Sequence, residues 1–131
     1  MKRRIILLFI SVILLNLAFK AEAQTQTKVV AKPDPIAPPV LVAPIEGAKL
    51  NMFPRKTIFE WRHVDGANKY EIEVEYNDGK WHILKNATTD LVSYTLDFIG
   101  KQPGRWRVRS FSKATGKAGV YSEWRNFTYL R

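Results

Sequence analysis

Alternating apolar and polar residues are clearest at residues 57–76, where the sequence reads TIFEWRHVDGANKYEIEVEY. In two runs the apolar side chains take every second position, which is the period of a strand with one buried face. The corner between the runs, residues 63–68, is rich in turn-forming residues. We therefore expect strands at residues 57–62 and 69–76, whose apolar faces need a second sheet to cover them.

Shorter runs of the same kind, separated by clusters of turn formers, lie on both sides of this stretch. They predict further strands at residues 40–42, 80–85, 91–96, 105–112 and 124–130. Asn77-Asp78-Gly79 is a hairpin signal, whereas residues 45–48 have the composition of a turn. Seven short strands predict an all-β, two-sheet antiparallel sandwich. Its predicted core consists of Phe59, Trp61, Tyr70, Ile72, Val74, Trp106 and Val108.

The first 23 residues have the pattern of a secretion signal. Three basic residues precede an apolar run at 5–19, and the small residues Ala21 and Ala23 end the segment. The run of about 15 residues is shorter than the roughly 20 that span a bilayer, which favours a cleaved signal over the alternative, a retained anchor. Residues 1–23 therefore predict an exported protein, located in the periplasm, on the cell surface or in the medium.

Residues 24–39 read QTQTKVVAKPDPIAPP, with four prolines within seven residues. This composition predicts an extended proline-rich linker, followed by a folded domain at residues 40–131. The Pro-x-x-Pro spacing of Pro35 and Pro38 leaves open that the arm is itself a ligand for an aromatic groove.

The net charge and the cysteine content limit which partners and which metal sites the chain can have. The formal charge of +9 falls to +6 without residues 1–23, which contain four basic residues and one acidic residue. This remainder suits solubility or an anionic partner, although we do not expect nucleic acid. The chain has no cysteine, so it can hold neither a disulfide nor a cysteine-bound zinc ion.

Several phrases of the sequence occur together in one known family. They are PVLVAPIEGAKL, then FEW-x-x-VDGA-x-x-YEIEV, then WRVRS followed by YSEW and NFTY. From about residue 39 to 131 the chain resembles a fibronectin type III domain of the bacterial sort. The resemblance implies a seven-stranded immunoglobulin-like sandwich, with the strands at 40–42, 57–62 and 91–96 in one sheet and the other four in the second.

The same resemblance assigns Trp61 as the core tryptophan, Tyr70 as an inward aromatic residue and Val108 as part of the core. The sequence departs from the family at residues 103–106, PGRW, where a tyrosine usually returns a hydrogen bond to the preceding corner. Because tryptophan has no hydroxyl group, Trp106 puts that corner in doubt.

No residue pattern indicates catalysis, a metal or a cofactor. His63 and His82, the only histidines, have no metal-ligand spacing. Asp65 and Asp97 are expected in turns rather than as a catalytic pair. We therefore expect a chain that is not an enzyme and needs no cofactor.

Two sets of charged residues alternate with the same period. Arg105, Arg107 and Arg109 share one face of their strand, and Glu71, Glu73 and Glu75 share the outward face of another. In the implied fold these strands are antiparallel neighbours, so we predict a structural charge ladder. The alternative is an arginine stripe that binds an anionic ligand.

Three aromatic residues, Trp81, Tyr121 and Trp124, have no obvious core position, and exposed aromatic side chains often anchor partners. They are candidate ligand-binding residues, and Trp124 is also placed to stack on an arginine of the ladder. These observations favour a non-enzymatic exported module that contacts a protein or serves as a structural or adhesive surface component. The alternative is a carbohydrate-binding module, accessory to polysaccharide processing, that uses these rings. The sequence identifies neither the partner, an unknown protein or glycan, nor the oligomeric state. We expect no stable membrane insertion once the signal has been cleaved.

Overall fold

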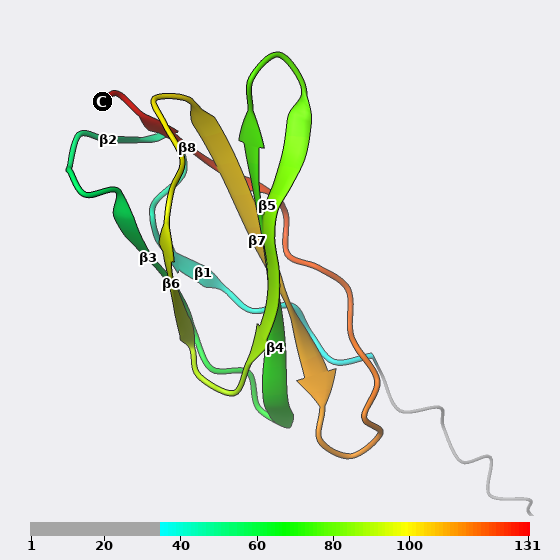
Figure 1. Cartoon of the computed structure of the whole chain (residues 1–131). Coiled ribbons are helices and arrows are strands. Elements are labelled where there is room, and N and C mark those ends of the chain that lie inside the picture. Colours follow the sequence, from blue (N-terminus) through cyan, green and yellow to red (C-terminus); the bar gives the residue numbers. More distant parts are fainter. Residues whose placement is uncertain (1–34) are drawn as a thin grey trace, which may run out of the picture. The chain divides into compact units, whose positions relative to one another are not determined.

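The computed structural model describes residues 35–131, which form eight strands in two sheets and, within this range, no helix (Figure 1). The predicted signal peptide and most of the predicted linker lie outside the described residues. Among the residues described, no helix is long and apolar enough to cross a membrane.

The smaller sheet has the strand order β1-β3-β6 and the larger one β2-β8-β7-β4-β5. The strands are β1 (Leu41–Ala43), β2 (Ala48–Leu50), β3 (Lys56–Trp61), β4 (Ala67–Asn77), β5 (Trp81–Thr89), β6 (Ser93–Asp97), β7 (Pro103–Ser112) and β8 (Arg125–Tyr129). All neighbours are antiparallel except β2 and β8. The predicted sandwich, with its division of strands between two sheets, is confirmed.

The prediction of a turn at residues 45–48 is wrong at its end, because the chain forms an eighth strand, β2, from Ala48. Gly47, with a φ of 72°, lets the chain leave the smaller sheet, and its amide donates to the Asn126 carbonyl at 2.8 Å. The next three residues then pair in parallel with β8, Ala48 opposite Phe127. Three residues are too short to show a period, and residues 48–50 lack the continuous apolar run that predicted the strand at 40–42.

β5 also extends beyond its predicted end, because residues 86–89 were expected in a turn. These residues, of which all but Ala87 are polar, pair with the first half of β4, with Thr89 opposite Tyr70. Since β5 is an edge strand, its side chains can stay polar while its backbone pairs on one side.

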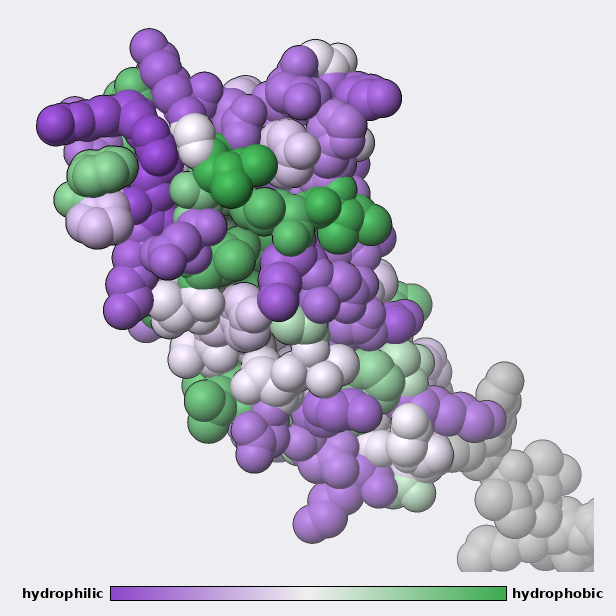
Figure 2. Space-filling view, viewed as in Figure 1, coloured by the Kyte–Doolittle hydropathy of each residue, from purple (hydrophilic) through white to green (hydrophobic). Residues whose placement is uncertain are grey.

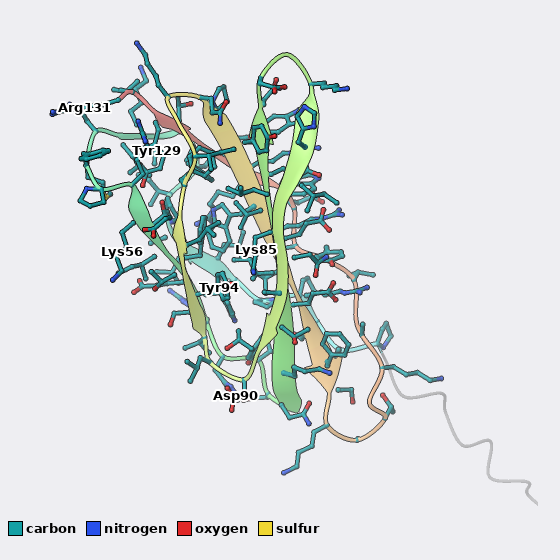
Figure 3. All side chains as sticks on the ribbon, viewed as in Figure 1. Lys56, Lys85, Asp90, Tyr94, Tyr129 and Arg131 are labelled. Carbon is teal, nitrogen blue, oxygen red and sulfur yellow. The ribbon has the colours of Figure 1, made fainter. Side chains whose placement is uncertain are left out.

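The core lies between the sheets and is mostly aromatic (Figure 3). All seven residues predicted as core are buried, together with Leu41, Phe98, Phe127 and Tyr129. The Phe59 ring centroid lies 5.1 Å from that of Trp106 and 5.8 Å from that of Phe127, and Trp61 packs edge-on against Tyr70 at 5.7 Å. Burying each such side chain contributes roughly 1.5–3 kcal/mol. Trp106, the residue at which the sequence departs from the expected tyrosine, is fully buried in this core.

Part of the predicted linker packs on the domain. Pro39 is buried, and a Cβ atom added to Gly119 would clash with the carbonyl oxygen of Ile36. Gly119 thus allows the chain just before β1 to lie close against the segment between β7 and β8.

Candidate functional site

The solvent face of the five-stranded sheet contains three ion pairs between neighbouring strands. The register sets three glutamates of β4 opposite three arginines of β7: Glu71 with Arg109, Glu73 with Arg107, and Glu75 with Arg105. The closest nitrogen–oxygen distances are 2.6, 3.1 and 2.6 Å in that order. The two sets of charges that the sequence analysis paired therefore lie side by side along the middle of the sheet.

The glutamates of these pairs are buried, although they are on the outer face. Each has a side chain only 11 or 12% exposed, whereas the arginine side chains are 24–32% exposed. A buried carboxylate is costly without a charged or hydrogen-bonding partner. The arginines satisfy that need and also cover the glutamates.

Aromatic rings alternate with the guanidinium groups along the same face. Arg105 lies 4.2 Å from the ring centroids of both Trp81 and Trp124, measured from its Cζ atom. Arg107 lies 4.2 Å from Trp124 and 4.1 Å from Tyr121. The series continues through Arg109, 4.6 Å from Tyr121 and 5.7 Å from Phe111, to Lys69, 4.3 Å from Phe111.

We call this series the arginine–aromatic ladder; in order it comprises Trp81, Arg105, Trp124, Arg107, Tyr121, Arg109, Phe111 and Lys69. A cation over a ring contributes about 0.5–1 kcal/mol when exposed and about 2 when desolvated. Because each inner guanidinium also donates to a glutamate, the ladder is held by two kinds of contact at once.

Two of the rings come from a segment that is not a strand. Tyr121 and Trp124 precede β8, and this segment is fixed along β7 by Ser122. The Ser122 amide donates to the Val108 carbonyl at 2.8 Å, and the Val108 amide donates to Ser122 Oγ at 3.1 Å. This double link places one ring on each side of Arg107.

Tyr121 adds a hydrogen bond that couples it to the ladder. Its hydroxyl donates to Glu71 Oε1 at 3.0 Å. Burial and the neighbouring Glu71 carboxylate raise the pKa of Tyr121 to about 12. Burial by itself would raise the pKa of Glu71, but hydrogen bonds from Arg109 and Tyr121 outweigh it and hold that pKa below its ordinary value. The pKa of Arg109 is raised, first by its hydrogen bond to Glu71.

The three aromatic residues predicted to bind a ligand are half-buried in this ladder rather than standing free. Trp124 and Tyr121 each contact two arginines, and Trp81, at one end, contacts one. Ring faces that lie against a guanidinium group are not open to a sugar ring. The alternative prediction was that the three arginines bind an anionic ligand. Each of them instead forms an ion pair with one glutamate of β4.

The ladder extends beyond the residues selected from the sequence, to Lys69 and Phe111. A signal for both was present, because Lys69 precedes Glu71 by two residues and Phe111 follows Arg109 by two. Side chains two apart on a strand share a face, so the period places both in the same row.

The two histidines lie in separate local contacts, and Asp97, expected in a turn, is instead the last residue of β6. His63 Nδ1 lies 3.2 Å from the Tyr70 hydroxyl, and His82 Nε2 lies 2.8 Å from Asp78 Oδ1. Asp65 is in the β3–β4 corner, while Asp97 ends β6 opposite Lys56. Within residues 35–131, no group of three potential ligands is placed to hold a metal ion.

Comparison with solved structures agrees with the architecture. An Fn3-like protein from Clostridium thermocellum superposes with a TM-score of 0.53 at 18% identity, over 73% of this chain and 95% of that one. The fn3 domain of human collagen α-1(XX) chain gives a TM-score of 0.54 at 15% identity, over 79% and 93%. A β-1,2-glucanase from Parabacteroides distasonis gives 0.51 at 17%, over 75% of this chain and 13% of that one.

No family model matches the sequence, and neither does any curated protein. The structural likeness nevertheless establishes that the domain has the fibronectin type III fold. At these identities it shows the fold and not a shared ligand.

Proposed function

We propose that this chain is a non-enzymatic exported module that contacts a protein partner or forms part of a structural or adhesive surface assembly. The proposal that it is not a catalyst is supported by its fibronectin type III fold, a fold of contact and spacer modules. The proposal of export is supported by the signal-like pattern of residues 1–23. Mass spectrometry of the protein outside the cytoplasm should find a chain that begins at Gln24, whereas a membrane-bound chain that retains Met1 would contradict export.

The observation that carries the proposal is the open edge of β5. This strand of nine residues is the last of its sheet, so its outer backbone groups are free to pair with an added strand. Ile83 on β5 is 63% exposed, and apolar surface gathers over the upper part of the face where β5 and β6 are seen (Figure 2). Exposed apolar surface beside the unpaired edge of a strand is typical of a protein-binding site.

A capture experiment tests this assignment. Residues 35–131, which contain the whole described core, would be immobilised and exposed to extracellular and periplasmic extracts of the source organism. We expect the wild-type domain to retain a defined partner and Ile83→Lys to lose it. The matched control is Ile58→Lys, at an exposed position on the outer face of β3 in the other sheet. Equal capture by both variants would place the contact away from β5.

Carbohydrate binding is the second candidate, and one observation favours it. Trp81, the end ring of the ladder, contacts a single cationic side chain, whereas each inner ring contacts two. A glycan array with the wild-type domain and with Trp81→Ala tests this alternative. Specific glycan binding that Trp81→Ala abolishes would support it over a protein partner.

A further inference from the structure

One end of the sandwich is built from three segments that are far apart in the sequence: residues 49–56, 97–102 and 130–131. Backbone hydrogen bonds join them, from Phe98 to the Arg55 carbonyl at 2.9 Å and from Leu130 to the Leu50 carbonyl at 2.9 Å. The Arg55 Nε atom also donates to the Arg131 carbonyl oxygen at 2.6 Å. We call this the basic end; in Figure 1 it is the region around β2 and the marked C-terminus.

The basic end holds most of the net charge of the described domain. Its five basic side chains and one acidic one give +4, and residues 35–131 as a whole give +5. The rest of the domain, with ten basic and nine acidic residues, is almost neutral. The residues concerned are Lys49, Arg55, Lys56, Lys101 and Arg131, with Asp97 as the acid. Figure 3 shows Lys56 and Arg131 pointing outward on the same side of the molecule.

Exposed apolar side chains accompany these charges. Phe53 is 70% exposed, the largest value among the exposed large apolar residues, and Met52, Ile99 and Leu130 are each more than 40% exposed. The Arg55 Cζ atom lies 5.5 Å from the Phe53 ring centroid, so a cationic and an apolar side chain are adjacent on this surface. The apolar residues come from all three segments.

We propose that the basic end docks on the surface of an anionic lipid bilayer. Basic side chains near such a surface are attracted by its negative potential. Apolar tips among those charges can enter the boundary between headgroups and acyl chains. A nucleic acid or another polyanion would use the charges but leave four exposed apolar side chains without a role. This inference is independent of the β5 contact proposed above.

Vesicle co-sedimentation tests the proposal with residues 35–131, since the apolar run at 5–19 would itself enter a bilayer. The vesicles would contain about one-third phosphatidylglycerol in phosphatidylcholine, with pure phosphatidylcholine for comparison. We expect binding to the anionic vesicles only, with a loss at roughly 0.5 M salt. Lys49→Glu with Lys101→Glu should lower the partition coefficient at least about tenfold. Phe53→Ser should lower it roughly fivefold.

Matched controls come from the opposite end of the domain. Lys113→Glu with Lys117→Glu makes the same charge change in the β7–β8 loop, and Leu91→Ser removes an apolar side chain that is 63% exposed, close to the 70% of Phe53. Both control variants, and Ile83→Lys, should bind like the wild type. Equal binding to neutral and anionic vesicles, or equal losses in the controls, would overturn the proposal. Heparin binding that needs the lysines but not Phe53, without vesicle binding, would instead identify a polyanion site.

Discussion

Arg107 lies directly across from Glu73 in the middle of the five-stranded sheet, and its Nη2 atom donates to Glu73 Oε1 at 3.1 Å. The same guanidinium group stands between the rings of Trp124 and Tyr121. One arginine thus neutralises a buried carboxylate and joins two rings held by a segment that is not a strand. This arrangement indicates that the face stabilises the fold.

Removing an inner ring of the ladder should cost more stability than removing an end ring. Trp124→Ala loses contacts with two arginines, and we expect a loss of about 1–3 kcal/mol in the free energy of unfolding. Trp81→Ala loses one such contact, and we expect about 1 kcal/mol. Urea denaturation of the two variants measures the difference. Equal losses would show that the number of stacking contacts does not determine how much each ring contributes to the free energy of unfolding.

Trp61 should be essential to the core. It is almost fully buried and packs edge-on against Tyr70, so Trp61→Ala should cost about 3–5 kcal/mol. Domains of this size have a total stability of about 5–15 kcal/mol, so the variant should be close to unfolding. Ile58→Ala, at an exposed position of the same strand, should melt near the wild-type temperature. An unchanged melting temperature for Trp61→Ala would contradict the assigned core.

Gly104 should not tolerate a side chain. It is buried on β7, and an added Cβ atom would collide with the ring of Phe127. Gly104→Ala should therefore destabilise the domain by about 1–3 kcal/mol through overpacking. Phe127→Leu should relieve part of that cost in the double variant. Thermal melts of the two single variants and the double variant check this, and a double variant no better than the additive sum would exclude the ring as the cause.

The domain should lose stability in acid partly through Glu71. The pKa of this carboxyl group is lower in the folded state than in the unfolded state, so the folded state binds fewer protons. Its contribution is complete above the unfolded value, near pH 4.5, and is lost as the pH falls through the folded value. Stability measured from about pH 6 to pH 2 should therefore fall less steeply in Glu71→Gln, although that variant starts lower. If stability fell equally steeply with pH in the wild type and in Glu71→Gln, the contribution of Glu71 to acid sensitivity would be contradicted.

The paired charges could be predicted because their signal is local. A period of two along each strand sets Glu71 and Arg109 on outward faces, and the implied fold makes those strands neighbours. The core followed for the same reason, since residues such as Phe59 and Ile72 alternate with polar ones.

The positions of Tyr121 and Trp124 could not be predicted in this way. They belong to a segment without strand periodicity, and only its link to β7 through Ser122 brings their rings against Arg107. The basic end was also hidden, because residues 49–56, 97–102 and 130–131 meet only through the course of the chain in three dimensions.

The claim that the ladder is structural is tested most directly by a double-mutant cycle on Glu73 and Arg107, read by urea denaturation. Glu73→Lys should cost about 1–2 kcal/mol, because like charges then face each other on a half-buried surface. Arg107→Glu should cost more, since it also loses two stacking contacts. The double variant should be about 1 kcal/mol more stable than the sum of the single changes predicts, with recovery incomplete because a glutamate cannot stack. Additive losses, together with heparin binding that Arg107→Glu abolishes, would contradict the account and show that the arginines form a ligand site.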